Sequence, residues 1–139
     1  MARFLTTLRV ERVEDTSRDG RGTWQLLNLF AYKSEVAETI FVVPQGFVTD
    51  FASVPRIPVA FLLTGDCAQE AAVIHDWLYT SHEVDRDVAD AVFKEAVALG
   101  NPGWRAWLMW AGVRIGGGGS WDAAGPAQPV NVADKLSEI

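Results

Sequence analysis

The sequence has few of the residues that build covalent or metal cross-links. Cys67 is the only cysteine among 139 residues, which excludes an intrachain disulfide and a zinc site made from a cluster of cysteines. Basic residues are also outnumbered: 12 Lys and Arg stand against 18 Asp and Glu, so the formal net charge is −6 at pH 7. The sequence therefore lacks the broad basic surface that neutralises phosphates, and we expect no nucleic-acid partner.

Long apolar segments and common nucleotide-binding motifs are missing as well. The longest apolar stretch, Trp104–Ile115, is interrupted by Arg105 and Arg114, and the N-terminal segment carries charge throughout. We therefore expect neither a membrane-spanning helix nor a signal peptide. The glycines at 116–119 follow a predicted helix and lack the Lys-Ser/Thr pair of a phosphate loop. The sequence also contains no GxSxG or dinucleotide-binding motif.

The first third of the chain predicts β-strands. Apolar and polar side chains alternate over Arg3–Val13, turn-forming residues follow at Asp15–Gly22, and strand-favouring residues return at Trp24–Tyr32 and Thr39–Val43. Because the connections between these segments are short, they predict one antiparallel sheet.

Three helices are predicted in the remainder. Apolar residues recur at helical spacing over Cys67–Tyr79, with no Gly or Pro inside. Asp85 is a suitable N-cap for a second helix that ends at Gly100, and a third helix spans Trp104–Ile115. The short connection between the first two helices predicts a helical hairpin.

The predicted fold class is therefore α+β, with an N-terminal antiparallel β-sheet followed by a helical hairpin and a third, Trp-rich helix. With 49% hydrophobic and 22% charged residues, the composition is typical of one compact domain, which we assign to residues 1–115. Residues 116–139 are rich in Gly, Ala and Pro. They predict an extended C-terminal arm.

Several polar residues lie in a segment whose other residues are typical of a buried loop. Thr49, Asp50, Ser53 and Arg56 lie within PQGFVTDFASVPR, where proline and glycine prevent a continuous helix or strand. On one interpretation the first three satisfy backbone amides of the loop and Arg56 pairs with a carboxylate. On the other, Asp50 is a hydrogen-bond acceptor or metal ligand that faces the following helix.

A second polar group interrupts the apolar helix AAVIHDWLY. His75 and Tyr79 are four residues apart and lie on one face, whereas Asp76 points about 100° away. A neutral imidazole can take a proton from water, and Asp90 on the second helix could fix its tautomer. The alternative is structural: Asp90 pairs with Arg86, His75 is a satisfied half-buried histidine, and Asp76 faces solvent.

Three segments together resemble a family of tailed bacteriophages and prophages known as the domain of unknown function 1353. They are PQGFVTDFASVPR (44–56), AAVIHDWLY (71–79) and RDVADAVFKEA (86–96). The resemblance extends from about Phe4 to about Ile115. It implies a phage or prophage gene near structural and lysis genes, without an established reaction. We expect a virion-associated protein, such as a tail protein, located in the particle or in the host cytoplasm before assembly.

The helices containing His75 and Asp90 also resemble the catalytic helices of viral phospholipases A2. That resemblance implies that His75 activates water, Asp76 holds calcium, Asp90 orients His75, and Tyr79 supports the network. The Gly-rich calcium loop of those enzymes has no counterpart in VPRIPVAFLLTGD, so the further candidate ligand is Asp50 or Asp66. On this interpretation the protein is a calcium-dependent ester hydrolase, and contact with a membrane follows from it.

The third helix has Trp104, Trp107 and Trp110 within seven residues. A helix that is apolar on so many sides is usually buried, so we expect a central core helix. The alternative is that one face docks on a partner subunit or a lipid interface.

From these observations we expect an assembly protein that binds other virion proteins through the third helix and the C-terminal arm. The alternative function is the hydrolase described above.

Overall fold

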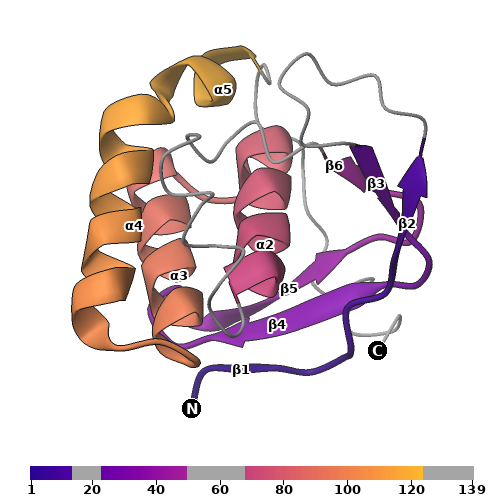
Figure 1. Ribbon diagram of the computed structural model, residues 1–139, viewed down its shortest axis with the longest axis horizontal. Coiled ribbons are helices and arrows are strands. Elements are labelled where there is room, and N and C mark those ends of the chain that lie inside the picture. Colours follow the sequence, from indigo (N-terminus) through magenta and orange to yellow (C-terminus); the bar gives the residue numbers. More distant parts are fainter. Residues whose placement is uncertain (14–22, 50–67, 124–139) are drawn as a thin grey trace.

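The computed structural model describes residues 1–13, 23–49 and 68–123, which form two layers, with the helices stacked on the strands (Figure 1). This arrangement confirms the predicted α+β class with antiparallel pairing. The strands are β1 (Arg3–Phe4), β2 (Val10–Val13), β3 (Thr23–Leu26), β4 (Phe30–Ser34), β5 (Thr39–Val43) and β6 (Val48–Thr49). The helices are α2 (Ala68–Ser81), α3 (Arg86–Ala98), α4 (Gly103–Gly116) and α5 (Gly118–Ala123).

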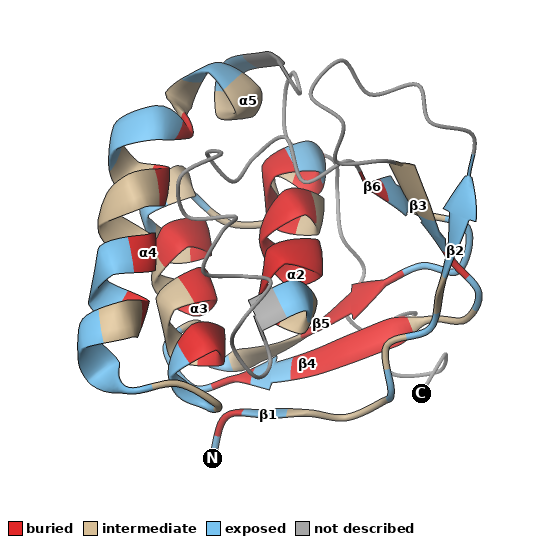
Figure 2. Ribbon diagram, viewed as in Figure 1, coloured by how far each residue is buried: buried red, intermediate tan, exposed pale blue. Residues whose placement is uncertain are grey.

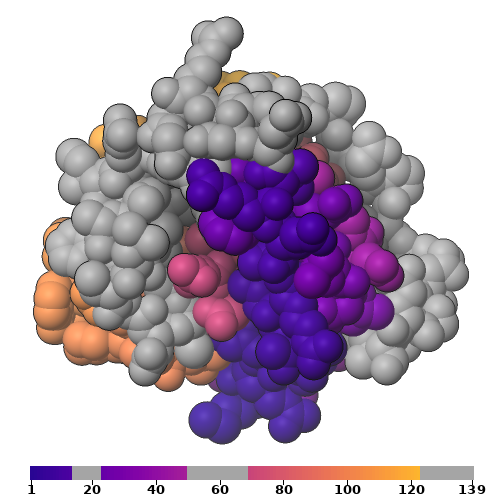
Figure 3. Space-filling model, turned by 45° about the vertical axis from the view of Figure 1, so that its right-hand side comes forward, coloured from indigo at the N-terminus to yellow at the C-terminus, as the bar shows by residue number. Residues whose placement is uncertain are grey.

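The strands divide into two three-stranded sheets, where the sequence predicted one. One sheet has the order β1-β4-β5 and the other β2-β3-β6, and every pairing is antiparallel. The predicted strand over Arg3–Val13 therefore contributes β1 to one sheet and β2 to the other. The predicted strand over Trp24–Tyr32 is divided in the same way between β3 and β4. Figure 3 shows residues 1–13 as a continuous band beside residues 23–49.

Polar side chains explain where the strands break. The hydroxyl of Thr6 accepts a hydrogen bond from the Ala31 amide at 3.0 Å and donates to the Leu29 carbonyl at 3.4 Å. The side-chain amide of Asn28 donates across to the Thr7 carbonyl at 3.4 Å as well as to the neighbouring Leu29 carbonyl at 2.8 Å. Side chains thus replace ladder hydrogen bonds between the paired segments, and the chain can pass from one sheet to the other there.

The helix boundaries lie within a few residues of the predicted ones. His82 ends α2 by adopting φ +53°, and its amide donates to the Leu78 carbonyl at 3.0 Å. Asp85 takes the predicted N-cap position of α3, although its side chain makes no capping hydrogen bond among the described residues. Within the described part of the chain, no helix has both the length and the apolarity to span a bilayer.

The core lies between the β1-β4-β5 sheet and the helices, and α2 is buried over most of its length (Figure 2). Helix α3 contacts both α2 and α4 and also touches β4. The Glu95 carboxylate joins α3 to the sheet, because it accepts hydrogen bonds from the Tyr32 and Ser34 hydroxyls at 2.9 Å each. It also accepts from the amides of Glu35 and Val36 in the turn after β4.

The first residues of the predicted C-terminal arm form a helix. The third helix ends at Gly116 as α4, but α5 follows at once, where the sequence predicted extended chain. Trp121 supplies the reason: its indole stacks on His82 at 3.7 Å between ring centroids and meets Tyr79 edge-on at 5.2 Å. This anchoring offsets the cost of about 1 kcal/mol that each glycine brings to a helix. The rest of the arm, 124–139, lies outside the described residues.

The Gly117→Ala variant will be less stable than the wild type by about 1–3 kcal/mol, the usual cost of overpacking. A Cβ at Gly117 would lie 2.5 Å from the Val113 carbonyl oxygen and 2.7 Å from the Tyr79 hydroxyl. Chemical denaturation of both proteins measures the difference.

Gly119→Ala is the matched control. A Cβ at Gly119 meets no described atom within 4 Å, so this variant should keep or slightly raise the free energy of unfolding. Equal stability of the two variants would show that Gly117 is not needed for the close approach of α5.

Candidate functional site

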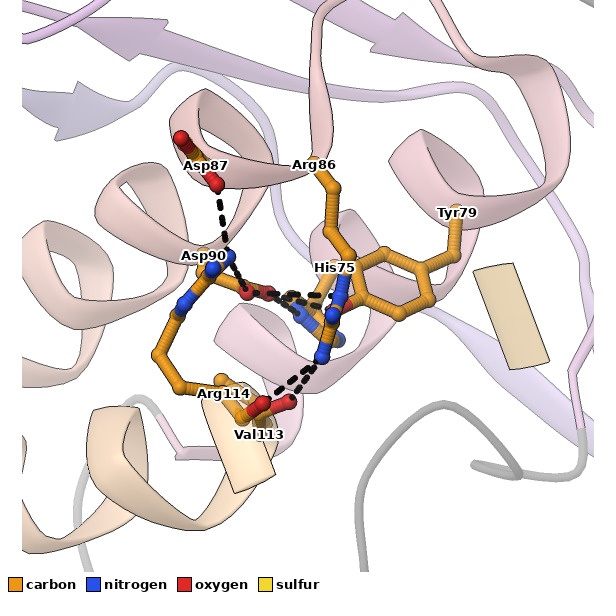
Figure 4. Close-up of polar contacts among 7 residues, drawn as sticks. All are labelled: His75, Tyr79, Arg86, Asp87, Asp90, Val113 and Arg114. Atoms are coloured by element: carbon orange, nitrogen blue, oxygen red, sulfur yellow. Dashed lines mark hydrogen bonds and ion pairs between the residues drawn. The ribbon is translucent and has the colours of Figure 1, made fainter. Parts of the chain in front are cut away.

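The polar residues predicted on the two hairpin helices meet at one buried carboxylate (Figure 4). Oδ1 of Asp90 lies 2.7 Å from Nε2 of His75 and accepts a hydrogen bond of 2.6 Å from the Tyr79 hydroxyl. Oδ2 accepts a hydrogen bond of 2.8 Å from Arg114 on α4. The side chains of His75 and Asp90 are fully buried. One carboxylate therefore joins α2, α3 and α4.

Arg86 closes this network on the side of α5. Its Nε donates to the Tyr79 hydroxyl at 3.1 Å, and its guanidinium also donates to the carbonyls of Val113 and Arg114 near the end of α4. The Arg86 guanidinium lies 3.9 Å from Asp90, farther than His75 does. Both predicted partners of Asp90 are thus present. His75 is in direct hydrogen-bond contact with it, whereas Arg86 acts mainly through Tyr79.

The electrostatics hold His75 neutral and Asp90 charged. Burial lowers the pKa of His75 below its ordinary value, against the raising influence of Asp90. Burial acts to raise the pKa of Asp90, but the hydrogen bonds from His75 and Tyr79 outweigh it, so that pKa is lowered. The same contact with Asp90 adds to burial in raising the pKa of Tyr79.

These charges determine the tautomer of His75. Because an ionised carboxylate only accepts hydrogen bonds, Nε2 of neutral His75 must carry the proton that faces Asp90. The basic lone pair is then on Nδ1. The imidazole packs at 4.1 Å from the Tyr79 ring and 4.8 Å from the Phe93 ring, measured between centroids, so its orientation is fixed as well.

Asp76 lies one residue along α2 from His75 and belongs to a separate contact. Its Oδ2 accepts a hydrogen bond of 2.5 Å from the Thr49 hydroxyl, and both residues are buried. The alternative in which Asp76 faces solvent is therefore wrong. The contact joins the PQGFVTDFASVPR segment to the His75 helix, but Asp50, Ser53 and Arg56 lie outside the described residues.

The described residues do not fit a calcium site. Within 1–13, 23–49 and 68–123, no three His, Cys, Asp or Glu side chains are grouped as a metal site would require. A calcium ion takes six to eight oxygen ligands, and in this part of the chain Asp76 is the only residue of the proposed ligand set.

Helix α4 is not the central core helix that its composition predicted. It lies at the edge of the helical layer, and its outer side is exposed (Figure 2). The residues it buries are Ala106, Met109 and Val113, whereas Trp104 is 62% exposed and Trp107 is 53% exposed. The helix thus buries Ala106, Met109 and Val113 and leaves Trp104 and Trp107 on the outside.

Trp110 differs from the other two tryptophans of α4. It is half-buried, and the ammonium group of Lys94 on α3 lies 5.2 Å from its ring centroid, within the range of a cation–π contact. The apolar surface of α4 is therefore made by Trp104, Trp107, Leu108 and Ile115, which are all exposed. We call these four residues the α4 face.

Sequence reasoning missed the third helix's contribution to the buried network. Arg114 is 24 residues from Asp90, and no periodic pattern connects positions so far apart. An arginine inside an otherwise apolar helix was the available signal, since a charge there needs a partner. Trp121 gave a similar signal as an isolated aromatic residue in a Gly-rich segment.

Comparison with known proteins identifies one family. The sequence pattern of the family described as "Protein of unknown function (DUF1353)" matches residues 24–113, which include α2, α3 and most of α4. Searches of curated proteins and of solved structures gave no match.

Lowering the pH from about 7 to about 5 will reduce the free energy of unfolding. Folded His75 stays neutral because its pKa is below the ordinary 6.5, whereas in the unfolded chain it binds a proton below about pH 6.5. The contribution of neutral His75 to the free energy of unfolding is therefore fully present above about pH 6.5. It is lost as the pH falls, by up to about 1.4 kcal/mol per pH unit. Urea unfolding at several pH values measures this slope.

Two glutamine variants test whether His75 causes this pH dependence of the free energy of unfolding. His75→Gln should be less stable than the wild type at neutral pH and should show a shallower loss in acid. His82→Gln removes the other histidine and is the matched control. The assignment fails if the slope disappears in His82→Gln instead.

Proposed function

We propose that this chain, which belongs to the protein family of unknown function DUF1353, is an assembly subunit of a phage or prophage particle. The phage setting rests on the resemblance of segments 44–56, 71–79 and 86–96 to proteins of tailed phages. The assembly role rests on the α4 face. We expect this face to contact other particle proteins.

The exposed tryptophans carry the proposal. Covering a half-exposed tryptophan is worth about 2–3 kcal/mol from its apolar area, so Trp104 and Trp107 together could supply most of the energy of a moderate interface. Tryptophan is enriched in the cores of protein interfaces. The opposite side of α4 is fixed to α3, with Arg114 bound to both Asp87 and Asp90. The face is therefore presented on a rigid support.

The assembly role predicts that a Trp104→Ser, Trp107→Ser double variant folds normally but is not incorporated. Both side chains are largely exposed, so the free energy of unfolding should change by less than about 1 kcal/mol. Incorporation is measured by quantifying the protein in particles made by a phage that carries the variant as its only copy.

The matched control is Leu27→Ser. Leu27 is exposed and belongs to the connection between β3 and β4. That connection lies away from α4 (Figure 1), so this variant should be incorporated at the wild-type level. Normal incorporation of the double variant would contradict the role of the α4 face.

A second function, ester hydrolysis, is favoured by the protonation state of His75. The Nε2 proton faces Asp90, so Nδ1 is the atom that would take a proton from an attacking water as general base. Tyr79 and Arg114 hold the Asp90 carboxylate in place. The same arrangement serves a structural role, and the complete burial of His75 favours that role.

Hydrolysis is tested with short-chain esters and phospholipid vesicles, each with and without calcium. An enzyme that uses His75 as its base should lose activity by about a hundredfold or more in His75→Gln and keep it in His82→Gln. Absence of activity in the wild type, or equal activity in both variants, would reject this second function.

A further inference from the structure

Helix α5 covers the Tyr79 side of the buried network. It turns back from the end of α4 toward the end of α2 (Figure 1), where Trp121 meets the Tyr79 ring edge-on at 5.2 Å between centroids. A Cβ on Gly117 would lie 2.7 Å from the Tyr79 hydroxyl. A Cβ on Gly118 would lie 3.5 Å from the Arg86 guanidinium. Because Tyr79 is only 1% exposed, this glycine backbone helps to keep water from its hydroxyl.

The network itself does not depend on α5. Within the described residues, the carboxylate of Asp90 is bound by side chains of α2, α3 and α4. The Arg86 side chain donates to Tyr79 of α2 and to two carbonyls of α4. None of these hydrogen bonds includes a residue of α5. The three longer helices can therefore stay joined when α5 moves away from them.

The composition of α5 makes it the least stable helix of the described chain. It has six residues, fewer than the roughly 12–15 that an isolated helix needs. It begins within a run of four glycines, 116–119, and glycine loses more conformational freedom on ordering than any other residue. Its anchor Trp121 is half-buried and stacks on His82, whose Nε2 lies 3.0 Å from the Trp121 carbonyl. Local opening favours such segments over a packed core.

We propose that α5 is a hinged lid that opens about the glycines 116–119 and admits water to the Tyr79 hydroxyl while α2, α3 and α4 stay packed. The glycines serve both states, since they allow close approach to Tyr79 when the lid is closed and free backbone rotation when it is open. This inference does not depend on the assembly role. For the second function, the open lid is a route by which water enters the network.

Acetylation of the full-length protein by N-acetylimidazole tests the lid, because the two tyrosines of the sequence form a matched pair. Tyr32 and Tyr79 are both buried, and each donates its hydroxyl to a carboxylate. Tyr32 belongs to β4, which lies far from α5 (Figure 1). We expect Tyr79 to be acetylated about tenfold or more faster than Tyr32. Low urea concentrations should hardly change the Tyr79 rate, because lid opening exposes little surface. Peptide mass spectrometry measures both rates.

Three variants move the lid in known directions. Trp121→Ala removes its anchor and should raise the Tyr79 rate about tenfold or more without changing the Tyr32 rate. Gly119→Ala should lower the Tyr79 rate about threefold, because alanine favours the helix and its Cβ meets no described atom within 4 Å. Trp104→Ala is the control: it removes an exposed tryptophan from α4 and should leave both rates unchanged.

Two results would overturn the lid. The first is equal acetylation of the two tyrosines with the same dependence on urea, since Tyr79 would then be reached only through global unfolding. The second is a Trp121→Ala variant in which the Tyr79 rate is unchanged, or in which the Tyr32 rate rises by the same factor.

The lid and the second function fail in different ways, because acetylation reports lid opening whether or not the protein hydrolyses esters. A lid that opens in a protein without esterase activity would reject the second function alone. Esterase activity in a protein whose Tyr79 is reached only through global unfolding would reject the lid alone.

Discussion

The structure depends on a charged carboxylate placed where water does not reach. Asp90 is fully buried, and a buried charge is tolerated only when hydrogen bonds and an opposite charge compensate for lost hydration. His75 and Tyr79 of α2 and Arg114 of α4 supply that compensation. Because these partners come from the helices on either side of α3, satisfying Asp90 fixes the positions of all three helices.

Helix α3 carries a second carboxylate with a similar task on its other side. Glu95 accepts hydrogen bonds from the end of β4 and from the turn that follows it, so α3 is fixed to the sheet as well as to its neighbouring helices. The rotation of α4 follows from these contacts. With Arg114 held by Asp87 and Asp90, α4 packs on α3 and buries Ala106, Met109 and Val113. Trp104 and Trp107 remain on the outside, where a second protein can cover them.

Local patterns in the sequence predicted those features of the fold that depend on residues close together in the chain. Helical spacing of apolar residues located the helices, and the short connection after α2 indicated that Asp90 could reach His75. Three features depended on distant contacts and were missed or predicted wrongly. The division into two sheets requires the side chains of Thr6 and Asn28 to replace ladder hydrogen bonds, and α5 requires Trp121 to pack on Tyr79 and His82. The exposure of α4 requires Arg114 to turn inward, which no spacing along α4 specifies.

The central claim, that the Asp90 carboxylate holds the helices together, is tested most directly by the free energy of unfolding of two isosteric variants. Asp90→Asn should cost about 3 kcal/mol, because it removes the charge that compensates Arg114 and changes the partner of His75. Asp87→Asn removes a carboxylate that contacts the same arginine but is 84% exposed, and it should cost less than about 1 kcal/mol. Equal, small losses in both variants would contradict the account.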